Sequence, residues 1–330
     1  MKDTLVIGME HKKFAFDRNI EPVAAIHSGD RVIFETEDAN VSLITKESDI
    51  WAEFPKLYDK GGGCNPVTGP VYVEGAKPGD CLSVDILRVV PGFIRKGGYT
   101  SIYSGLGMLQ DCKGSLQPPL EPRTKICPIE EDGIHFKLHE SDEYLKLPVR
   151  PFVGTIGVAP KEDRRSSFYQ GQDWCGNVDI GDITEGTTVI LPVHVEGAMF
   201  SIGDIHALQG DGEITGCALE CQGIVEVRIS VISSEEAFYC DWPQVNTDEW
   251  MGAIACLGYR NLSEAVKTGY TELIRRMEKE YGMDQLDSYQ LLNLMGEVKV
   301  GNSSSCLCKI RRDVLKRYKA VSYTHLRAHE

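Results

Sequence analysis

Short alternating segments separated by glycine-containing turns recur along most of this chain. Valine, isoleucine and aromatic residues alternate with polar ones in these segments, which is typical of β-strands. The clearest examples are residues 31–36, 70–74, 82–87, 188–195 and 223–231. Gly-Asp pairs, which favour tight turns, recur at residues 29–30, 79–80, 181–182 and 203–204. The pattern predicts a β-rich fold built from many short strands.

Helical periodicity is concentrated near the end of the chain. Ser263 is expected to cap a helix whose apolar residues recur at three- and four-residue intervals up to Tyr281, and Gly282 ends the pattern. A shorter helix is expected from Leu286 to Met295. Because these apolar faces are expected to cover a sheet, the fold class is α+β, dominated by mixed or antiparallel sheet.

An internal echo bears on domain organisation. Residues 71–76 and 193–198 match at five of six positions, and each is followed closely by a Gly-Asp pair. Duplicated β-lobes, residues 1–120 and 121–320, would explain the echo, and a shared strand–turn solution explains it equally well. A chain of 330 residues, 42% of them hydrophobic, can bury a large core, so we expect one domain over residues 1–320. Residues 321–330 fit nothing before them and are treated as a non-native tail.

Residues 194–216 concentrate side chains that hold metals and move protons, namely His194, Asp204, His206, Asp211 and Glu213. Asp204 and His206 are two residues apart, so on an extended backbone they project from the same face. Glycines at positions 203, 210 and 212 allow turns that could bring His194 and Glu213 to the same point. Each residue alone can equally be a turn aspartate or a core histidine. Together, imidazole and carboxylate are the ligands that zinc and similar ions accept in hydrolytic sites.

The charge balance excludes some classes of partner. The chain has 49 acidic and 35 basic residues, a net charge of −14, which disfavours nucleic acids and anionic membranes. No apolar run approaches the ~20 residues that a membrane span needs. The 11 cysteines include no Cys-x-x-Cys pair, and no leader opens the chain, so we expect a reduced, cytoplasmic setting.

The segment Phe200-Ser-Ile-Gly-Asp-Ile-His-Ala-Leu-Gln-Gly-Asp-Gly-Glu213 resembles the signature of the acetamidase/formamidase family. Residues 65–80, 151–160 and 176–179 also resemble this family, in the expected order, so the resemblance covers roughly residues 20–315. It implies metal-dependent hydrolysis of short aliphatic amides to a carboxylate and ammonia. The chain departs from the family pattern at Trp174-Cys175, where many members have His-Gly, and at Asn65, where many have histidine.

The chemistry of amide hydrolysis assigns roles within the motif. A hydrolytic metal needs about three protein ligands and open positions, and we expect His194, Asp204 and His206 to be the ligands. Glu213 is then expected to be the general base that takes the proton of water and delivers it to the leaving ammonia. Zinc or a similar divalent ion is the expected cofactor. The surplus of acidic side chains also suits an oxygen-coordinated ion such as calcium.

Four further residues are expected around the site. Asn177 is expected to hydrogen-bond the substrate oxygen, and Asp179 to orient a ligand histidine by a hydrogen bond without contacting the metal. Asp38 and Asn65 resemble family positions that line the pocket and are expected to bind substrate. Turn or strand-end roles explain Asp38 and Asp179 equally well.

Two alternatives stay open at this point. Cys175 lies beside the Gly-Asn-x-Asp motif, and a cysteine-dependent amidase would use it as the nucleophile. A non-catalytic β-protein that binds a metal or ligand would retain the scaffold without the reaction. The expected partners are a small amide and further copies of the same chain, as a homodimer or other homo-oligomer.

Overall fold

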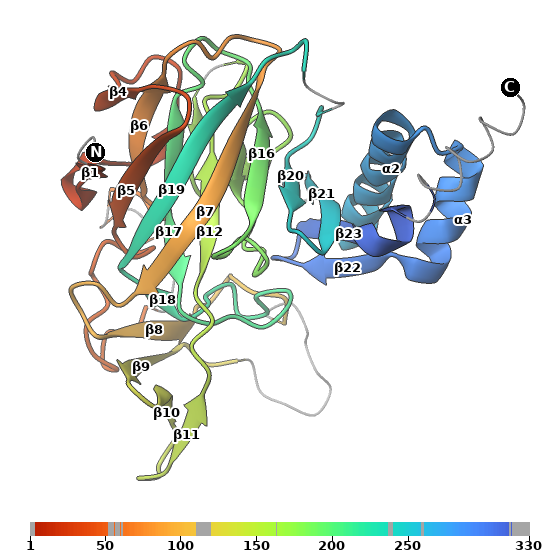
Figure 1. The fold of residues 1–330 in the computed structure, drawn as a ribbon. Coiled ribbons are helices and arrows are strands. Elements are labelled where there is room, and N and C mark those ends of the chain that lie inside the picture. The colour runs from red at the N-terminus through yellow and green to blue at the C-terminus, as the bar shows by residue number, and fades with distance from the viewer. Residues whose placement is uncertain are drawn as a thin grey trace, which may run out of the picture.

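Two large β-sheets pack against each other, and a unit with two helices lies at one end (Figure 1). The computed structural model describes residues 4–51, 56, 60, 62–109, 120–162, 164–236, 240–258, 261–316 and 318. The expected non-native tail, residues 321–330, lies outside the described residues.

The first sheet is mixed, and its strands show the expected alternation. In spatial order it contains β1 (Leu5–Ile7), β5 (Asp30–Thr36), β19 (Gly223–Ile232), β7 (Cys81–Pro91), β16 (Thr188–Pro192), β20 (Gln244–Asn246), β21 (Trp250–Cys256), β23 (Ser305–Arg311) and β22 (Glu297–Val300). In β19, Val225, Val227 and Ile229 are fully buried, whereas Glu226 and Arg228 between them reach solvent. One face of this sheet therefore supplies core.

The second sheet carries the site. Its main path contains β11 (Tyr144–Leu147), β10 (Gly133–Lys137), β9 (Arg123–Glu130), β8 (Gly97–Ile102), β18 (Glu220–Cys221), β17 (Phe200–His206), β12 (Phe152–Gly157), β15 (Cys175–Asn177) and β14 (Gln170–Gly171). β6 (Val67–Val73) also pairs with β17 and is itself paired by β2 (Lys12–Lys13) and β4 (Ala24–Ile26). A short ribbon joins β3 (Ala15–Phe16) and β13 (Arg165–Ser166), and a 3₁₀ turn spans Met9–His11.

The two sheets meet through apolar side chains and close backbone contact. Phe34 of β5 packs edge-on against Phe200 of β17, with ring centroids 5.8 Å apart. A side-chain carbon on Gly223 of β19 would lie 2.9 Å from the side chain of Ile205, so only glycine lets β19 approach β17 this closely. Because both faces of β17 are covered, all seven of its residues are buried.

The helical unit packs on the far end of the first sheet (Figure 1). Helix α2 (Leu262–Tyr281) begins at Asn261, whose side chain accepts a hydrogen bond from the Glu264 amide, and ends at Gly282 in a left-handed conformation. The predicted cap at Ser263 is wrong because Asn261 already accepts that bond. Helix α3 (Gln285–Met295) is capped by Asp284 and matches the predicted second helix to within one residue.

The predicted fold class is confirmed: a β-rich α+β protein with mixed and antiparallel sheets and C-terminal helices. Both sheets take strands from residues 1–120 and from residues 121–320, so the two expected lobes interleave. Gly75 and Gly197, which correspond in the sequence echo, both have left-handed backbones, with φ of 84° and 72°. Among the described helices, none combines the length and apolar character required to cross a membrane.

Candidate active site

The site forms around the end of β17, which pairs with β12 along one edge and with β6 and then β18 along the other. Asp204 has φ of 58°, a left-handed backbone that costs a non-glycine residue on the order of 1–3 kcal/mol. Gly203 and Asp204 both lie within β17, which spans Phe200–His206. The turn predicted at this pair is therefore wrong. A side-chain carbon on Gly154 of β12 would lie 2.8 Å from carboxylate oxygens of both Asp179 and Asp204. Glycine there leaves room for two carboxylates.

Three buried polar atoms converge beside β17 without a hydrogen-bond partner among the described residues. They are Asp204 Oδ1, His206 Nε2 and Glu220 Oε2. His206 Nε2 lies 3.4 Å from Asp204 Oδ1 and 3.3 Å from Glu220 Oε2. Two ligands about 2.0–2.1 Å from a tetrahedral zinc ion are themselves ~3.3 Å apart, so these spacings match those of a ligand set.

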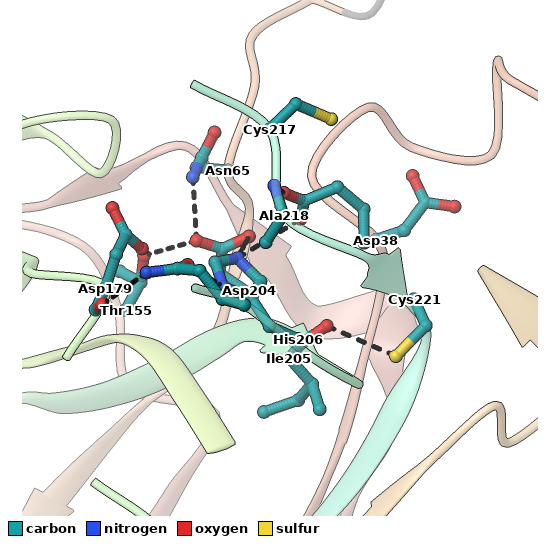
Figure 2. Close-up of polar contacts among 12 residues, drawn as sticks. Asp38, Asn65, Thr155, Asp179, Asp204, Ile205, His206, Cys217, Ala218 and Cys221 are labelled. Carbon is teal, nitrogen blue, oxygen red and sulfur yellow. Dashed lines mark hydrogen bonds and ion pairs between the residues drawn. The ribbon is translucent and has the colours of Figure 1, made fainter. Parts of the chain in front are cut away.

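The other polar atoms of these three side chains are held by the protein. Asp204 Oδ2 accepts hydrogen bonds from Asn65 Nδ2 at 2.8 Å and Thr155 Oγ1 at 3.1 Å. Glu220 Oε1 accepts from the Ala218 amide at 2.9 Å, and His206 Nδ1 lies 2.9 Å from Gln209 Oε1. Figure 2 shows Asn65 and Thr155 directed at Asp204. Each side chain is therefore fixed by one atom and presents the other to a common point.

Asn177 strengthens this arrangement. Carboxylate oxygens only accept, so its amide nitrogen must face them, and it then lies 3.0 Å from both Asp204 Oδ2 and Asp179 Oδ1. Asp179 Oδ2 also accepts from Asn302 Nδ2 at 2.8 Å. Asp179 does not hydrogen-bond a histidine side chain in the described residues. Its backbone carbonyl instead accepts from Gln209, the residue that contacts His206.

The cluster is electrostatically crowded. Burial raises the pKa of Asp179 to about 7 and raises the pKa of Glu220. Burial, and then the charge of Asp179, raise the pKa of Glu213 well above its usual range. For Asp204, burial is outweighed by His206, and its pKa is lowered. For His206, burial is outweighed by Glu220 and Asp204, and its pKa is raised well above its usual range.

A cation would relieve this crowding better than a proton. A protonated His206 carries a single Nε2 proton, which cannot satisfy two carboxylate oxygens at once. A divalent ion held by these side chains would bring two positive charges to the three orphaned atoms. The donor set of one imidazole and two carboxylates is one that zinc accepts. The residues present therefore fit a divalent metal. Two overlapping groups share His206: it lies with Asp179 and Asp204 in one, and with Glu213 and Glu220 in the other.

A cavity of about 130 Å³ opens beside the cluster. Its polar wall includes Asn65, Asn177, Asp179, Glu213, Glu220 and Asn302. Its apolar wall includes Tyr103, Leu106, Met108 and Phe168. Glu213 lies on the loop that follows β17. The chain makes a tight turn at this residue, where the Gly216 amide donates a hydrogen bond to the Glu213 carbonyl at 2.7 Å.

Asp38 lies behind the cavity wall. Its Oδ1 accepts hydrogen bonds from the amides of Asn40 and Ser42, and burial, with the charge of Glu37, raises its pKa to about 6. Asn40 and its neighbour Ala39 line the cavity, whereas Asp38 does not. In Figure 2 the Asp38 carboxylate points away from Asp204. The structure thus places Asp38 at a turn outside the cavity lining, where it holds two backbone amides.

His194 lies apart from the cluster. The predicted strand over residues 188–195 ends at Pro192, so His194 falls in the segment between β16 and β17. His206 ends β17, and a strand of seven residues spans about 20 Å. The charged groups that act on His194 are Asp173, Lys161 and Asp241, none of which belongs to the cluster. The structure does not bring His194 to Asp204 and His206.

Sequence reasoning missed three residues of the site. Glu220 lies directly opposite His206 in the β17–β18 pairing. Its one signal was an acidic residue flanked by apolar residues in the segment 217–221. Gln209 belongs to the family-like motif, but the sequence suggested no role for it. Asn302 hydrogen-bonds Asp179, from which it is separated by 123 positions in the chain.

A comparison with family models shows which family the chain belongs to. The acetamidase/formamidase family model matches residues 8–173 and 164–302, most of the chain. The chain belongs to the acetamidase/formamidase family. The resemblance seen in the sequence is thereby confirmed.

Relatives and solved structures agree. The chain is 29% identical to the acetamidase of Mycolicibacterium smegmatis over 51% of this chain and 54% of that protein. It is 26% identical to the formamidase of Methylophilus methylotrophus over 50% of this chain and 51% of that protein. The matches thus span about half the length of these relatives. The crystal structure of an acetamidase from Bacillus halodurans superposes with a TM-score of 0.83, 31% identity and coverage of 95% of this chain and 99% of the other.

This member of the acetamidase/formamidase family keeps a donor where the sequence departs from the family pattern. Asn65, at a position where many members have histidine, donates through Nδ2 to Asp204. Its backbone is left-handed, with φ of 49°, a conformation that asparagine accepts more readily than most residues. At the other departure, Cys175 is fully buried in β15 and is not among the residues that line the cavity.

Proposed function

We propose that this protein is a metal-dependent amidohydrolase that cleaves short aliphatic amides to a carboxylate and ammonia. The observation that carries the proposal is the convergence of Asp204 Oδ1, His206 Nε2 and Glu220 Oε2, buried and without hydrogen-bond partners. Membership of the acetamidase/formamidase family supports the reaction class. We propose these three residues as the metal ligands, with Glu220 in the place that the sequence had suggested for His194.

A divalent ion such as zinc would supply Lewis acidity, which polarises a carbonyl group and makes water more acidic. The chain supplies the proton transfers. Glu213 lines the cavity and has a pKa raised by burial, so it is suited to accept the proton of the attacking water and pass it to the leaving nitrogen. That transfer completes the reaction, since the amide C–N bond breaks as the nitrogen gains its proton.

Asn65 and Asn177 take positioning roles in this proposal. Both amide nitrogens lie within hydrogen-bond distance of Asp204 Oδ2, which keeps Oδ1 directed at the common point. From the sequence, Asn177 was expected to hydrogen-bond the substrate oxygen, and Asn65 was expected to bind the substrate. Because their donors are engaged by a carboxylate, we propose that they orient Asp204 instead.

The cavity suits a small substrate. Its volume of about 130 Å³ and an apolar wall with Tyr103, Leu106 and Phe168 favour a short acyl group over a long or charged one. The acidic groups of the opposite wall disfavour anionic substrates. Formamide and acetamide meet both conditions.

We expect ammonia release from formamide or acetamide to be lost after treatment with a chelator and restored by zinc. The test measures ammonia from a panel of short amides with the untreated, chelated and zinc-, calcium- or manganese-supplemented protein. Restoration by calcium and not by zinc would assign the site to an oxygen-coordinated ion. Full activity of protein shown by elemental analysis to be free of metal would refute the metal-dependent reaction, and metal binding without turnover would leave a binding protein.

The substitution Cys175→Ser is expected to retain most of the amidase activity. A nucleophilic thiol must be reachable and its thiolate stabilised, yet Cys175 is fully buried and contacts the thiol of Cys256. Cys217 does line the cavity, but burial and the charges of Glu220 and Glu213 raise the pKa of its thiol well above the usual range. A trapped thioester in mass spectrometry, or an inactive Cys175→Ser protein that still holds metal, would favour the cysteine mechanism.

A further inference from the structure

Gln209 links the cluster to the turn between β22 and β23. Its Oε1 lies 2.9 Å from His206 Nδ1, and its Nε2 donates to the carbonyls of Asp179 at 2.8 Å and Gly301 at 3.2 Å. The Gly301 carbonyl is itself fixed in place. A side-chain carbon on Gly301 would lie 2.0 Å from the Val178 carbonyl oxygen, so the turn is packed directly against the backbone that follows β15.

These contacts determine which way the Gln209 amide faces. Carbonyl oxygens only accept hydrogen bonds, so the two carbonyls must face the Gln209 nitrogen. The amide oxygen is then left for His206, and that oxygen also only accepts. His206 must therefore carry its proton on Nδ1. The neutral tautomer with a bare Nδ1 would place two lone pairs against each other at 2.9 Å.

We propose that Gln209 is a positioning residue that holds His206 in the Nδ1–H form and so reserves Nε2 for the common point with Asp204 and Glu220. Phe152 completes the restraint, because its ring meets the imidazole edge-to-face with centroids 4.9 Å apart. Phe152 fixes the plane of the ring and Gln209 fixes which nitrogen faces the cluster. The tautomer follows from hydrogen bonding alone. Its consequence for metal binding rests on the proposed function.

The first test reads the tautomer in the parent protein. Nitrogen-15 NMR of the histidine side chains, with His206 assigned from a His206→Asn protein and recorded at a pH at which its imidazole is neutral, is expected to show a proton on Nδ1 and none on Nε2, with and without zinc. A bare Nδ1 in the parent protein overturns the proposal. This measurement needs no catalytic turnover, so it succeeds or fails independently of the proposed amidase activity.

The second test separates the acceptor of Gln209 from its donors. Gln209→Leu removes both, whereas Gln209→Glu keeps an acceptor for Nδ1–H and loses the donations to the two carbonyls. Losing an outer partner of a ligand histidine weakens metal binding about 10- to 100-fold, and we expect a loss of that size in zinc affinity for Gln209→Leu. Gln209→Glu is expected to bind zinc at least about 10-fold more tightly than Gln209→Leu and to keep the Nδ1 proton.

The matched control is Gln244→Leu, which removes another buried glutamine, from β20 in the first sheet. Its zinc affinity is expected to equal that of the parent. Equal losses in Gln209→Leu and Gln209→Glu would reduce Gln209 to a tether between backbone segments and overturn the proposal. If the parent binds no zinc while Nδ1 is protonated, the proposed metal site fails and the assignment of the tautomer stands.

Discussion

The substitution Glu220→Gln is expected to remove the bound metal and lower turnover by on the order of 10³-fold. The change keeps the size of the side chain but replaces the charged carboxylate of a proposed ligand by a neutral amide. A catalytic metal supplies several kcal/mol of stabilisation to the transition state, and each ~1.4 kcal/mol is a factor of ten in rate. Elemental analysis of the dialysed protein, beside ammonia release from acetamide, measures both effects.

The matched control for Glu220→Gln is His194→Ala. His194 was the histidine expected from the sequence to be a ligand, and the structure surrounds it with Asp173, Lys161 and Asp241 instead. We expect His194→Ala to keep its metal and most of its turnover. The opposite result, with metal lost from His194→Ala and kept in Glu220→Gln, would restore the ligand set predicted from the sequence.

The contrast between His194 and Glu220 shows what the sequence could predict about the site. Asp204 and His206 were predictable because they are two residues apart on one strand. Glu220 depends on the pairing of β17 with β18, a strand of two residues that no periodicity reveals. The structure places His194 apart from Asp204 and His206, because β16 ends at Pro192 and not at residue 195 as the alternation had predicted. Residue types suggested the chemistry, and strand pairing determines which of these side chains lie close together.

The same distinction applies to the fold. The alternation in β19 and the glycine after α2 are local signals, and both elements lie where they were predicted. β17 shows no alternation because both of its faces are buried, and its left-handed Asp204 looked like a turn. The contact of Asn302 with Asp179 depends on how the C-terminal hairpin docks, which spacing along the chain cannot reveal.

The substitution Glu213→Gln is expected to lower turnover by at least ~10²-fold while metal content stays the same. Glutamine keeps the shape of the side chain but cannot accept a proton. Glu213 lines the cavity, and its pKa is raised by burial and by Asp179, which suits a group that takes a proton from water and returns it to nitrogen. The measurement is kcat and KM for acetamide, with zinc content determined on the same sample. We expect the loss in kcat, since the group acts on protons in transit and contributes little to holding the amide.

Asp211→Asn is the matched control for Glu213→Gln. It makes the same carboxylate-to-amide change two residues earlier on the same loop, where Asp211 is paired with Lys299 at 2.7 Å on the surface. Its turnover is expected to stay within about threefold of the parent, because surface ion pairs contribute little. Loss of zinc together with turnover in Glu213→Gln would make Glu213 a ligand. Unchanged turnover would pass the role of base to Asp179, the other cavity-lining carboxylate with a raised pKa outside the proposed ligand set.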